Sequence, residues 1–141
     1  MLNSTAPWTR LFQSLACCLP ALISIHPSSA ATFLVTNTAD SGVGSLRQAV
    51  LDANLTSGLD TIAFRIAGAK PYAITLATGL PSITDPVILD GTTQTNFTGQ
   101  PIIQLIGASA GAVNGLLILS GNTTVRGLVI NRFNAAGIRI E

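Results

Sequence analysis

Three short segments near the end of the chain carry one pattern: Gly115-Leu116-Leu117-Ile118, Gly127-Leu128-Val129-Ile130 and Gly137-Ile138-Arg139-Ile140. In each segment a glycine is followed by an apolar residue, a variable residue and an isoleucine. The steps between the three glycines are 12 and 10 residues, which add up to 22. A period of roughly 20 to 50 residues is typical of repeat architectures. The pattern therefore predicts a chain that returns to the same wall every 22 residues.

Alternate residues of a strand point to opposite faces, so each segment has an inner and an outer set of side chains. The predicted inner positions are Leu116, Ile118, Leu128, Ile130, Ile138 and Ile140, and the predicted outer positions are Leu117, Val129 and Arg139. Leu116 would lie above or below Ile138, one full coil later, while Leu128 would lie on another wall of that coil. One coil cannot bury its inner face alone, whereas stacked coils can.

Strand signals along the chain, including the three segments above, share β-branched residues and links rich in Gly, Asn, Ser, Thr and Pro. They fall at residues 32–38, 61–66, 72–76, 87–89, 102–106, 115–119, 124–130 and 137–140. From residue 60 onward no helix separates these signals, and parallel strands in an open sheet need crossover helices. We therefore expect an all-β parallel solenoid and exclude a doubly wound α/β fold.

One helix is predicted, over residues 45–54. Apolar residues recur there at the spacing of one helical face: Leu46, Ala49, Val50 and Ala53. Ser45 and Gln48 have the spacing of a capping box, in which each side chain satisfies a free amide at the helix start. We interpret the helix as a cap over the first coil, because terminal repeats need covering. A helix packed on the side of a sheet is the alternative.

The N-terminus has the layout of a secretory signal peptide, which we place at residues 1–30. Arg10 precedes a mostly apolar run over residues 11–25, and Ser28-Ser29-Ala30-Ala31 supplies small residues for cleavage after Ala30 or Ala31. An uncleaved membrane anchor is the competing interpretation, but a span needs about 20 apolar residues. A lipidated cysteine at Cys17 or Cys18 is disfavoured because the apolar run continues beyond them.

The composition limits the possible partners. Hydrophobic residues make up 48% of the chain and charged residues 9%, against roughly 25% charged residues in ordinary soluble domains. Removal of Arg10 from the seven basic residues leaves six, which balance the six acidic ones. This balance gives no electrostatic case for binding nucleic acid or an anionic membrane. Both cysteines would leave with the signal peptide, so packing and backbone hydrogen bonds would stabilise the mature chain.

Two groups of charged residues are candidates for catalysis. Asp85 and Asp90 are the nearest candidate carboxylate pair for glycoside hydrolysis, but each precedes a proline or glycine, which is ordinary turn chemistry. The arginines of a lyase-like site would be Arg126, Arg132 and Arg139; the alternative is an outer face that keeps the fold soluble. We favour the structural interpretations. The sequence therefore predicts no catalytic residue, no metal site and no cofactor.

Four asparagines in predicted turns complete the set of polar candidates. They are Asn114, Asn122, Asn131 and Asn134. Asparagine tolerates left-handed backbone geometry and forms hydrogen-bonded ladders between stacked strands. We expect these residues to have structural tasks.

Several segments in one order resemble the N-terminal region of bacterial right-handed parallel β-helix surface or secreted proteins with an SLRQA-type or SLREA-type start. They are Phe33-Leu34-Val35-Thr36-Asn37-Thr38-Ala39-Asp40-Ser41-Gly42, Gly44-Ser45-Leu46-Arg47-Gln48-Ala49-Val50, Asp60-Thr61-Ile62, Leu80-Pro81, Ile83-Thr84, Asp90-Gly91-Thr92-Thr93-Gln94 and Arg126-Gly127-Leu128-Val129-Ile130-Asn131-Arg132-Phe133. The resemblance covers nearly all of the mature chain. It implies an all-β, right-handed parallel β-helix with a short N-terminal capping helix.

The resemblance also implies an exported protein, secreted or at the cell surface, with an adhesion-like role and a glycan or another surface protein as partner. The alternative is the N-terminal part of a carbohydrate-active enzyme, a polysaccharide lyase or glycoside hydrolase, whose site lies in further coils. A stand-alone cap without activity is the third possibility. We expect residues 31–141 to be the N-terminal cap and first coils of a longer β-helix, because the chain stops directly after a strand.

Overall fold

The computed structural model describes residues 29–141 of the chain, which contain one α-helix, one 3-10 turn and nine short strands. The predicted signal peptide lies outside the described residues except for Ser29 and Ala30. The elements, in chain order, are β1 (Thr32–Val35), α1 (Leu46–Leu55), β2 (Asp60–Phe64), β3 (Tyr72–Thr75), β4 (Val87–Asp90), η1 (Gly91–Thr93), β5 (Ile103–Ile106), β6 (Leu116–Ile118), β7 (Thr124–Arg126), β8 (Leu128–Asn131) and β9 (Ile138–Ile140).

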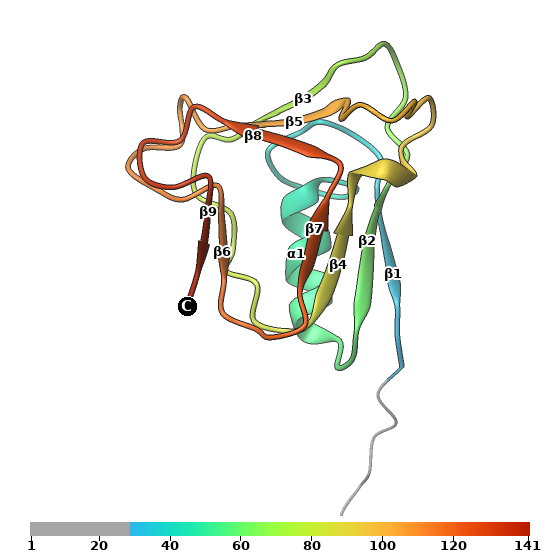
Figure 1. Cartoon of the computed structure of the whole chain (residues 1–141), viewed down its shortest axis with the longest axis vertical. Helices are drawn as coiled ribbons and strands as arrows, with labels where there is room; N and C mark the ends of the chain where they lie inside the picture. Colours follow the sequence, from blue (N-terminus) through green and yellow to red (C-terminus); the bar gives the residue numbers. More distant parts are fainter. Residues whose placement is uncertain (1–28) are drawn as a thin grey trace, which may run out of the picture.

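The strands form three small parallel sheets with the orders β1-β2-β4-β7, β3-β5-β8 and β6-β9. From β4 onward, successive strands of one sheet are separated in sequence by one strand from each of the other two sheets, whereas only α1 separates β1 from β2 and only β3 separates β2 from β4. Figure 1 shows the three sheets on three sides of the molecule, with α1 seen inside their outline in this view.

The predicted fold class, an all-β right-handed parallel β-helix, has to be corrected. The structure is a mixed fold, in which one helix combines with nine strands in three separate sheets, and none of these sheets is closed. Two physical reasons account for the difference. The strands are only three to five residues long, because turn-forming residues interrupt them. In addition, the helix supplies four side chains to the common apolar core rather than being a minor addition to it.

The 22-residue register is confirmed. Strand β6 pairs with β9 in parallel, with Leu116 opposite Ile138 and Ile118 opposite Ile140. Leu128 lies in a different sheet, as expected, where it pairs with Ile103 of β5. Main-chain bonds continue this register beyond the strand ends, since the Glu141 amide donates to the Ile118 carbonyl at 3.0 Å.

The prediction of one strand over residues 124–130 is wrong. Gly127 has φ +70°, and this left-handed residue separates β7 from β8. Strand β7 pairs with β4 and β8 pairs with β5, so the two belong to different sheets. Glycine adopts this backbone conformation without the steric penalty that other residues carry.

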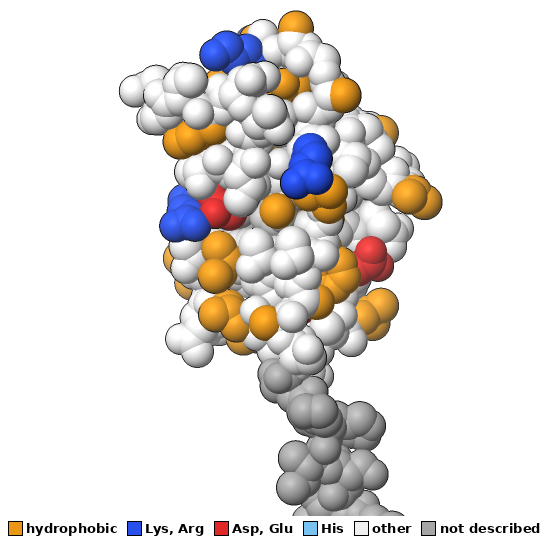
Figure 2. All heavy atoms as spheres, turned by 90° about the vertical axis from the view of Figure 1, so that its right-hand side faces the viewer, with side chains coloured by type: hydrophobic (Ala, Val, Ile, Leu, Met, Phe, Trp, Pro, Cys, Tyr) orange, Lys and Arg blue, Asp and Glu red, His pale blue; other side chains and the backbone are white. Residues whose placement is uncertain are grey.

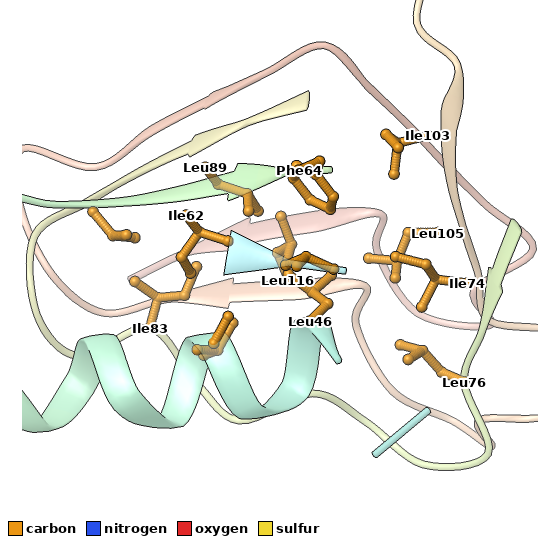
Figure 3. Packing of buried hydrophobic residues seen from close by; sticks show 14 of the residues in the cluster. Leu46, Ile62, Phe64, Ile74, Leu76, Ile83, Leu89, Ile103, Leu105 and Leu116 are labelled. Carbon is orange, nitrogen blue, oxygen red and sulfur yellow. The ribbon is translucent and has the colours of Figure 1, made fainter. Parts of the chain in front are cut away.

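The core is one cluster of apolar side chains contributed by all three sheets and the helix. Figure 3 shows side chains converging from strands and helix on the same interior, among them Leu46, Ile62, Leu89, Ile103 and Leu116. Each such side chain is at most 1% exposed, and full burial of a Leu or Ile stabilises the fold by about 1.5–3 kcal/mol.

Some predicted inner positions are not buried. Ile138 and Ile140 are 42% and 75% exposed, whereas Leu116 and Ile118, with which they pair, are buried. Leu128 and Ile130 are half-buried. Among the predicted outer positions only Arg139 is exposed, whereas Leu117 and Val129 are half-buried.

The helix begins one residue after its predicted cap and is confirmed as an element. The Ser45 hydroxyl accepts a hydrogen bond from the Gln48 amide at 3.2 Å, as the capping pattern predicts. The reciprocal half of the capping box is wrong, because the Gln48 side chain donates to Asp52 Oδ1 at 2.8 Å instead. This i, i+4 pair lies on the helix surface, where such pairs meet.

The helix lies across one end of the space between the sheets (Figure 1). One side packs on β1 and β2. At its start, Arg47 donates to the carbonyls of Thr78 and Gly79 at 3.0 and 2.5 Å. Near its end, Asn54 donates to the Ser82 carbonyl at 2.7 Å. These bonds join the helix to the segment between β3 and β4, in which Ile83 bridges to Ile118 of the third sheet. The helix thus contacts more than one side of the core, which agrees with covering one end of the core better than with packing on the side of one sheet.

Candidate functional site

The turn at Asp90 joins the four-stranded sheet to the next side of the molecule. Asp90 ends β4 and caps η1, where its Oδ1 accepts bonds from the amide and the hydroxyl of Thr92 at 3.0 and 2.6 Å. Its own carbonyl accepts from the Thr93 hydroxyl at 2.7 Å. Asp at this position satisfies an otherwise free amide at the start of the turn. The carboxylate thus shapes the local backbone.

The other oxygen of this carboxylate pairs across the sheet. Arg126 lies opposite Asp90 in the β4–β7 ladder, and its Nη2 donates to Asp90 Oδ2 at 2.5 Å. The Arg126 hydrogen bond lowers the pKa of Asp90 below its usual value, with further lowering by the Thr92 bonds, while burial acts in the opposite direction. The same pair raises the pKa of Arg126. The pair therefore favours an ionised Asp90 in the folded protein.

Gln94 follows this turn, and its side chain pairs with main-chain groups as a neighbouring strand would. Its side chain is buried, with Oε1 accepting from the Ile66 amide and Nε2 donating to the Ile66 carbonyl, both at 2.8 Å. Just before it, the Thr93 hydroxyl accepts from the Phe64 amide at 2.7 Å. Two polar side chains thus satisfy main-chain groups at the end of β2, beyond the last residue that pairs with β4.

A hollow of about 250 Å³ lies beside this turn. We call it the Arg65 hollow; its lining residues are Arg65, Ile66, Ala67, Gly68, Tyr72, Thr95 and Asn96. Asn96 is one of these lining residues and has a left-handed backbone with φ 72°. The Tyr72 hydroxyl donates to the Gly68 carbonyl at 3.0 Å, which fixes the ring. A guanidinium, an amide and a hydroxyl at one hollow can donate and accept hydrogen bonds with a polar ligand.

A second hollow, also of about 250 Å³, lies between the segment around Gly79 and the loop before β6. Its lining residues are Gly79, Leu80, Ser82, Ala112, Val113, Asn114 and Leu117. Asn114 Oδ1 already accepts from the Ala136 amide at 3.1 Å, and the Ser82 carbonyl already accepts from Asn54. Because no charged side chain lines this hollow and these acceptors are engaged, it offers fewer groups for a polar ligand than the Arg65 hollow.

The two candidate carboxylates have separate structural partners. Asp85 Oδ2 accepts from the Gly58 amide at 3.2 Å, and the Asp85 carbonyl accepts from the Ser120 hydroxyl at 3.0 Å. Asp90 binds Thr92 and Arg126, as described above. The structure thus places both residues at turns beside β4, one at each end of the strand.

The three candidate arginines belong to different parts of the fold. Arg126 lies in β7 of the four-stranded sheet, Arg132 follows β8 of the three-stranded sheet, and Arg139 lies in β9 of the third. Arg139 forms an ion pair with Glu141 at 2.5 Å, and Arg132 adopts a left-handed backbone with φ 59°. The structure does not gather them on one sheet. In Figure 2, the face that includes β1 and β2 shows Lys and Arg side chains that stand apart from one another, one of them beside an acidic side chain.

Two of the four asparagines act as expected. Asn122 adopts left-handed geometry with φ 56°, and Asn114 bonds to a residue 22 positions later. Asn134 makes a weaker contact of 3.4 Å with the Gly111 carbonyl. Asn131 is different, because its Oδ1 is buried without a hydrogen-bond partner.

Sequence reasoning missed Gln94, Arg65 and Asp60. Gln94 follows the Asp90-Gly91-Thr92-Thr93 turn. A glutamine directly after a turn is only a weak signal for a buried side chain that bonds to the main chain of a strand. Asp60 opens β2 and is completely buried. Its position before an apolar strand gave the pattern of an ordinary turn residue, so its burial could not be read from the sequence.

Within residues 29–141 no helix is long and apolar enough to cross a membrane. In the same part of the chain, His, Cys, Asp and Glu side chains do not gather in groups of three that could hold a metal ion.

No protein-family model matches the chain, and the curated proteins compared with it include no significant match.

Proposed function

We propose that this chain is an exported protein, secreted or held at the cell surface, that works as a non-enzymatic binding module for glycans or other surface proteins. The proposal rests on the N-terminal signal pattern, on the resemblance to bacterial surface proteins and on the use that the structure makes of its polar side chains. The last observation carries the argument against catalysis.

The charged and polar side chains that could take part in catalysis connect segments that are distant in sequence. Asp90 joins β4 to β7 through Arg126. Gln94 joins the turn after η1 to the end of β2. Arg47 also forms an ion pair with Asp40 at 2.8 Å, besides its bonds to the segment at Thr78 and Gly79. A carboxylate or guanidinium held by such partners stabilises the fold and is poorly available for proton transfer to a substrate.

The Arg65 hollow is the binding site that the geometry supports best. It combines Arg65, the Asn96 amide and the Thr95 hydroxyl, whereas the neighbouring Tyr72 is only 4% exposed and belongs to the core. Sugars present hydroxyl groups that donate and accept hydrogen bonds with such polar side chains. A shallow site of this kind fits one or two sugar units at the surface of a larger glycan.

The test is binding of the exported product of this 141-residue chain to an array of immobilised glycans, with three variants. Arg65→Ala removes the guanidinium. Asn96→Gly removes the amide while glycine retains the left-handed backbone. Arg139→Ala is the matched control, because that arginine is exposed and lies in β9.

We expect glycan binding that weakens at least about tenfold in the first two variants, equivalent to about 1.4 kcal/mol, and is unchanged in the control. Equal binding by all variants would remove the Arg65 hollow from the proposal. Release of reducing ends or unsaturated products from a polysaccharide by the purified protein would contradict the non-enzymatic role.

A further inference from the structure

The described residues contain one carboxylate whose environment the proposed function does not explain. Asp60 begins β2 and is 0% exposed. Its Oδ1 accepts a hydrogen bond from the Ala31 amide at 2.7 Å. Its Oδ2 is buried and has no hydrogen-bond partner.

Such an arrangement is costly for an ionised group. A buried carboxylate is normally paired with a cation or saturated with hydrogen bonds. The ion pairs among residues 29–141 involve Asp40, Asp90 and Glu141, so Asp60 has no cationic partner there. An amide nitrogen can offer Asp60 only one N–H, which leaves Oδ2 unsatisfied.

Ala31 is the first described residue that is bound to the folded part of the chain. Ser29 and Ala30 are exposed, whereas Ala31 is half-buried. The Ala31 carbonyl accepts from the Thr61 amide at 2.8 Å, so both main-chain groups of Ala31 bind the start of β2. The nitrogen of Ala31 is therefore fixed against the buried carboxylate, while the two residues before it project into solvent.

We propose that the exported chain is cut between Ala30 and Ala31, and that the new α-ammonium group of Ala31 forms a buried ion pair with Asp60. This inference rests on the proposed export. In the cleavage step, an export peptidase hydrolyses the peptide bond with one water molecule. Ala30 leaves with the carboxylate, and the nitrogen of Ala31 becomes an ammonium group at neutral pH.

The proposal accounts for both oxygens of Asp60. An ammonium group has three N–H donors where the amide had one. One donor retains the bond to Oδ1, and another becomes available to Oδ2. The added positive charge compensates the buried negative charge, which a neutral amide does not.

Asp60 also distinguishes the two cleavage sites that the sequence allows. Cleavage before Ala31 leaves small residues, Ser28 and Ala30, at the positions that export peptidases require. Cleavage after Ala31 would remove the nitrogen to which Asp60 is bound. The structure therefore favours the first site.

The first experiment is expression of all 141 residues in an exporting bacterial host, followed by intact-mass analysis of the secreted product. The expected mature chain begins at Ala31. An exported product that begins at Thr32 or elsewhere overturns the inference while the proposed export stands. Retention of the uncut chain inside the cell overturns the proposed export itself.

The second experiment measures the ion pair. Lys70 is the only lysine in the sequence, so Lys70→Arg leaves the α-amine as the single amine for acetylation in urea. After refolding, we expect acetylation to lower the folded-to-unfolded ratio at least about tenfold, because it leaves a buried charge unpaired. In an Asp60→Asn background acetylation should have no such effect. The matched control is Asp85→Asn, since Asp85 also accepts one main-chain amide but does not bind Ala31.

A third measurement covers the case in which Asp60→Asn does not fold. The rate at which an amine reagent modifies the α-amine of the mature protein is compared between native and urea-denatured protein. Lys70 is exposed and serves as the internal reference. We expect the native α-amine to react at least about tenfold more slowly than the denatured one. Equal rates, or equal effects of acetylation with and without Asp60, overturn the ion pair.

Discussion

At the scale of single residues, close approach of the backbone decides where glycine is required. Gly91 and Gly127 face each other at the junction of β4 and η1 with β7 and β8. A methyl group on Gly91 would overlap the Gly127 carbonyl, and one on Gly127 would overlap the Thr92 amide. Both obstacles are main-chain atoms, which cannot move aside as a side chain can.

Gly91→Ala should therefore lower the free energy of unfolding by about 1–3 kcal/mol, the usual cost of forcing extra atoms into a packed site. Gly121→Ala is the control, because a methyl group there meets no atom within 4 Å. Urea denaturation of both variants measures the difference. Equal stability of the two would show that the strands are not as close at this junction as the structure has them.

The Asp90–Arg126 pair predicts a pH dependence. The folded state lowers the pKa of Asp90 below its ordinary value, chiefly through the Arg126 hydrogen bond. The ionised Asp90 carboxylate therefore contributes fully to stability above its pKa in the unfolded chain. This contribution is lost as the pH falls through the lower pKa of Asp90 in the folded protein. Arg126→Gln should reduce stability at pH 7 and make the loss of stability less steep as the pH falls below about 4, the ordinary pKa of an Asp side chain.

Urea midpoints of wild type and Arg126→Gln at intervals from pH 7 to pH 2 measure this effect. Arg132→Gln is a suitable control, because this arginine forms no ion pair with another described residue. Parallel pH curves for wild type and Arg126→Gln would show that the pair does not set the ionisation of Asp90.

At the scale of elements, the helix was the best predicted part of the molecule. The apolar spacing of Leu46, Ala49, Val50 and Ala53 gave its buried face, and Ser45 gave its start. Strand positions were also predictable, but one junction was not. Gly127 lies inside an apolar β-branched run, and nothing local in that run shows that its two halves pair with different sheets.

Loss of the helix cap should destabilise the protein measurably. Ser45 is completely buried and accepts from the Gln48 amide, so Ser45→Ala should lower the free energy of unfolding by about 1 kcal/mol. Its hydroxyl also donates to the Gly42 carbonyl at 2.7 Å, which adds to the cost. Ser41→Ala, at an exposed position of the preceding turn, should stay within about 0.5 kcal/mol of wild type. The opposite order of the two variants would contradict the assigned cap.

At the scale of the whole molecule, the sequence predicted the pairing better than the fold class. The 22-residue spacing gave the Leu116–Ile138 register because a repeat places equivalent residues side by side. It also placed Leu128 on another wall than Leu116. It did not give the third sheet or the share of the core that α1 supplies, because both depend on contacts among segments without a shared pattern. The Arg65 hollow was unpredictable for the same reason, since Arg65, Tyr72 and Asn96 come from three different segments.

The common core predicts a large effect from one central side chain. Leu89 of β4 is 0% exposed and belongs to the cluster shared by sheets and helix. Leu89→Ala should lower the free energy of unfolding by about 2–5 kcal/mol. Leu55→Ala, at the 86% exposed end of the helix, should change it by less than about 0.5 kcal/mol. Thermal or urea unfolding measures both, and a small effect at Leu89 would contradict a single shared core.

The most direct test of the account is cysteine cross-linking between strands 22 residues apart. With Cys17 and Cys18 replaced by alanine, the pair Leu117→Cys and Arg139→Cys places thiols at directly paired positions of β6 and β9. The pair Leu117→Cys and Val129→Cys places them on different sheets. Mild oxidation followed by mass analysis should give the 117–139 disulfide in nearly all molecules and little of the 117–129 disulfide. Preferential formation of the 117–129 disulfide would contradict the parallel register on which the structure depends.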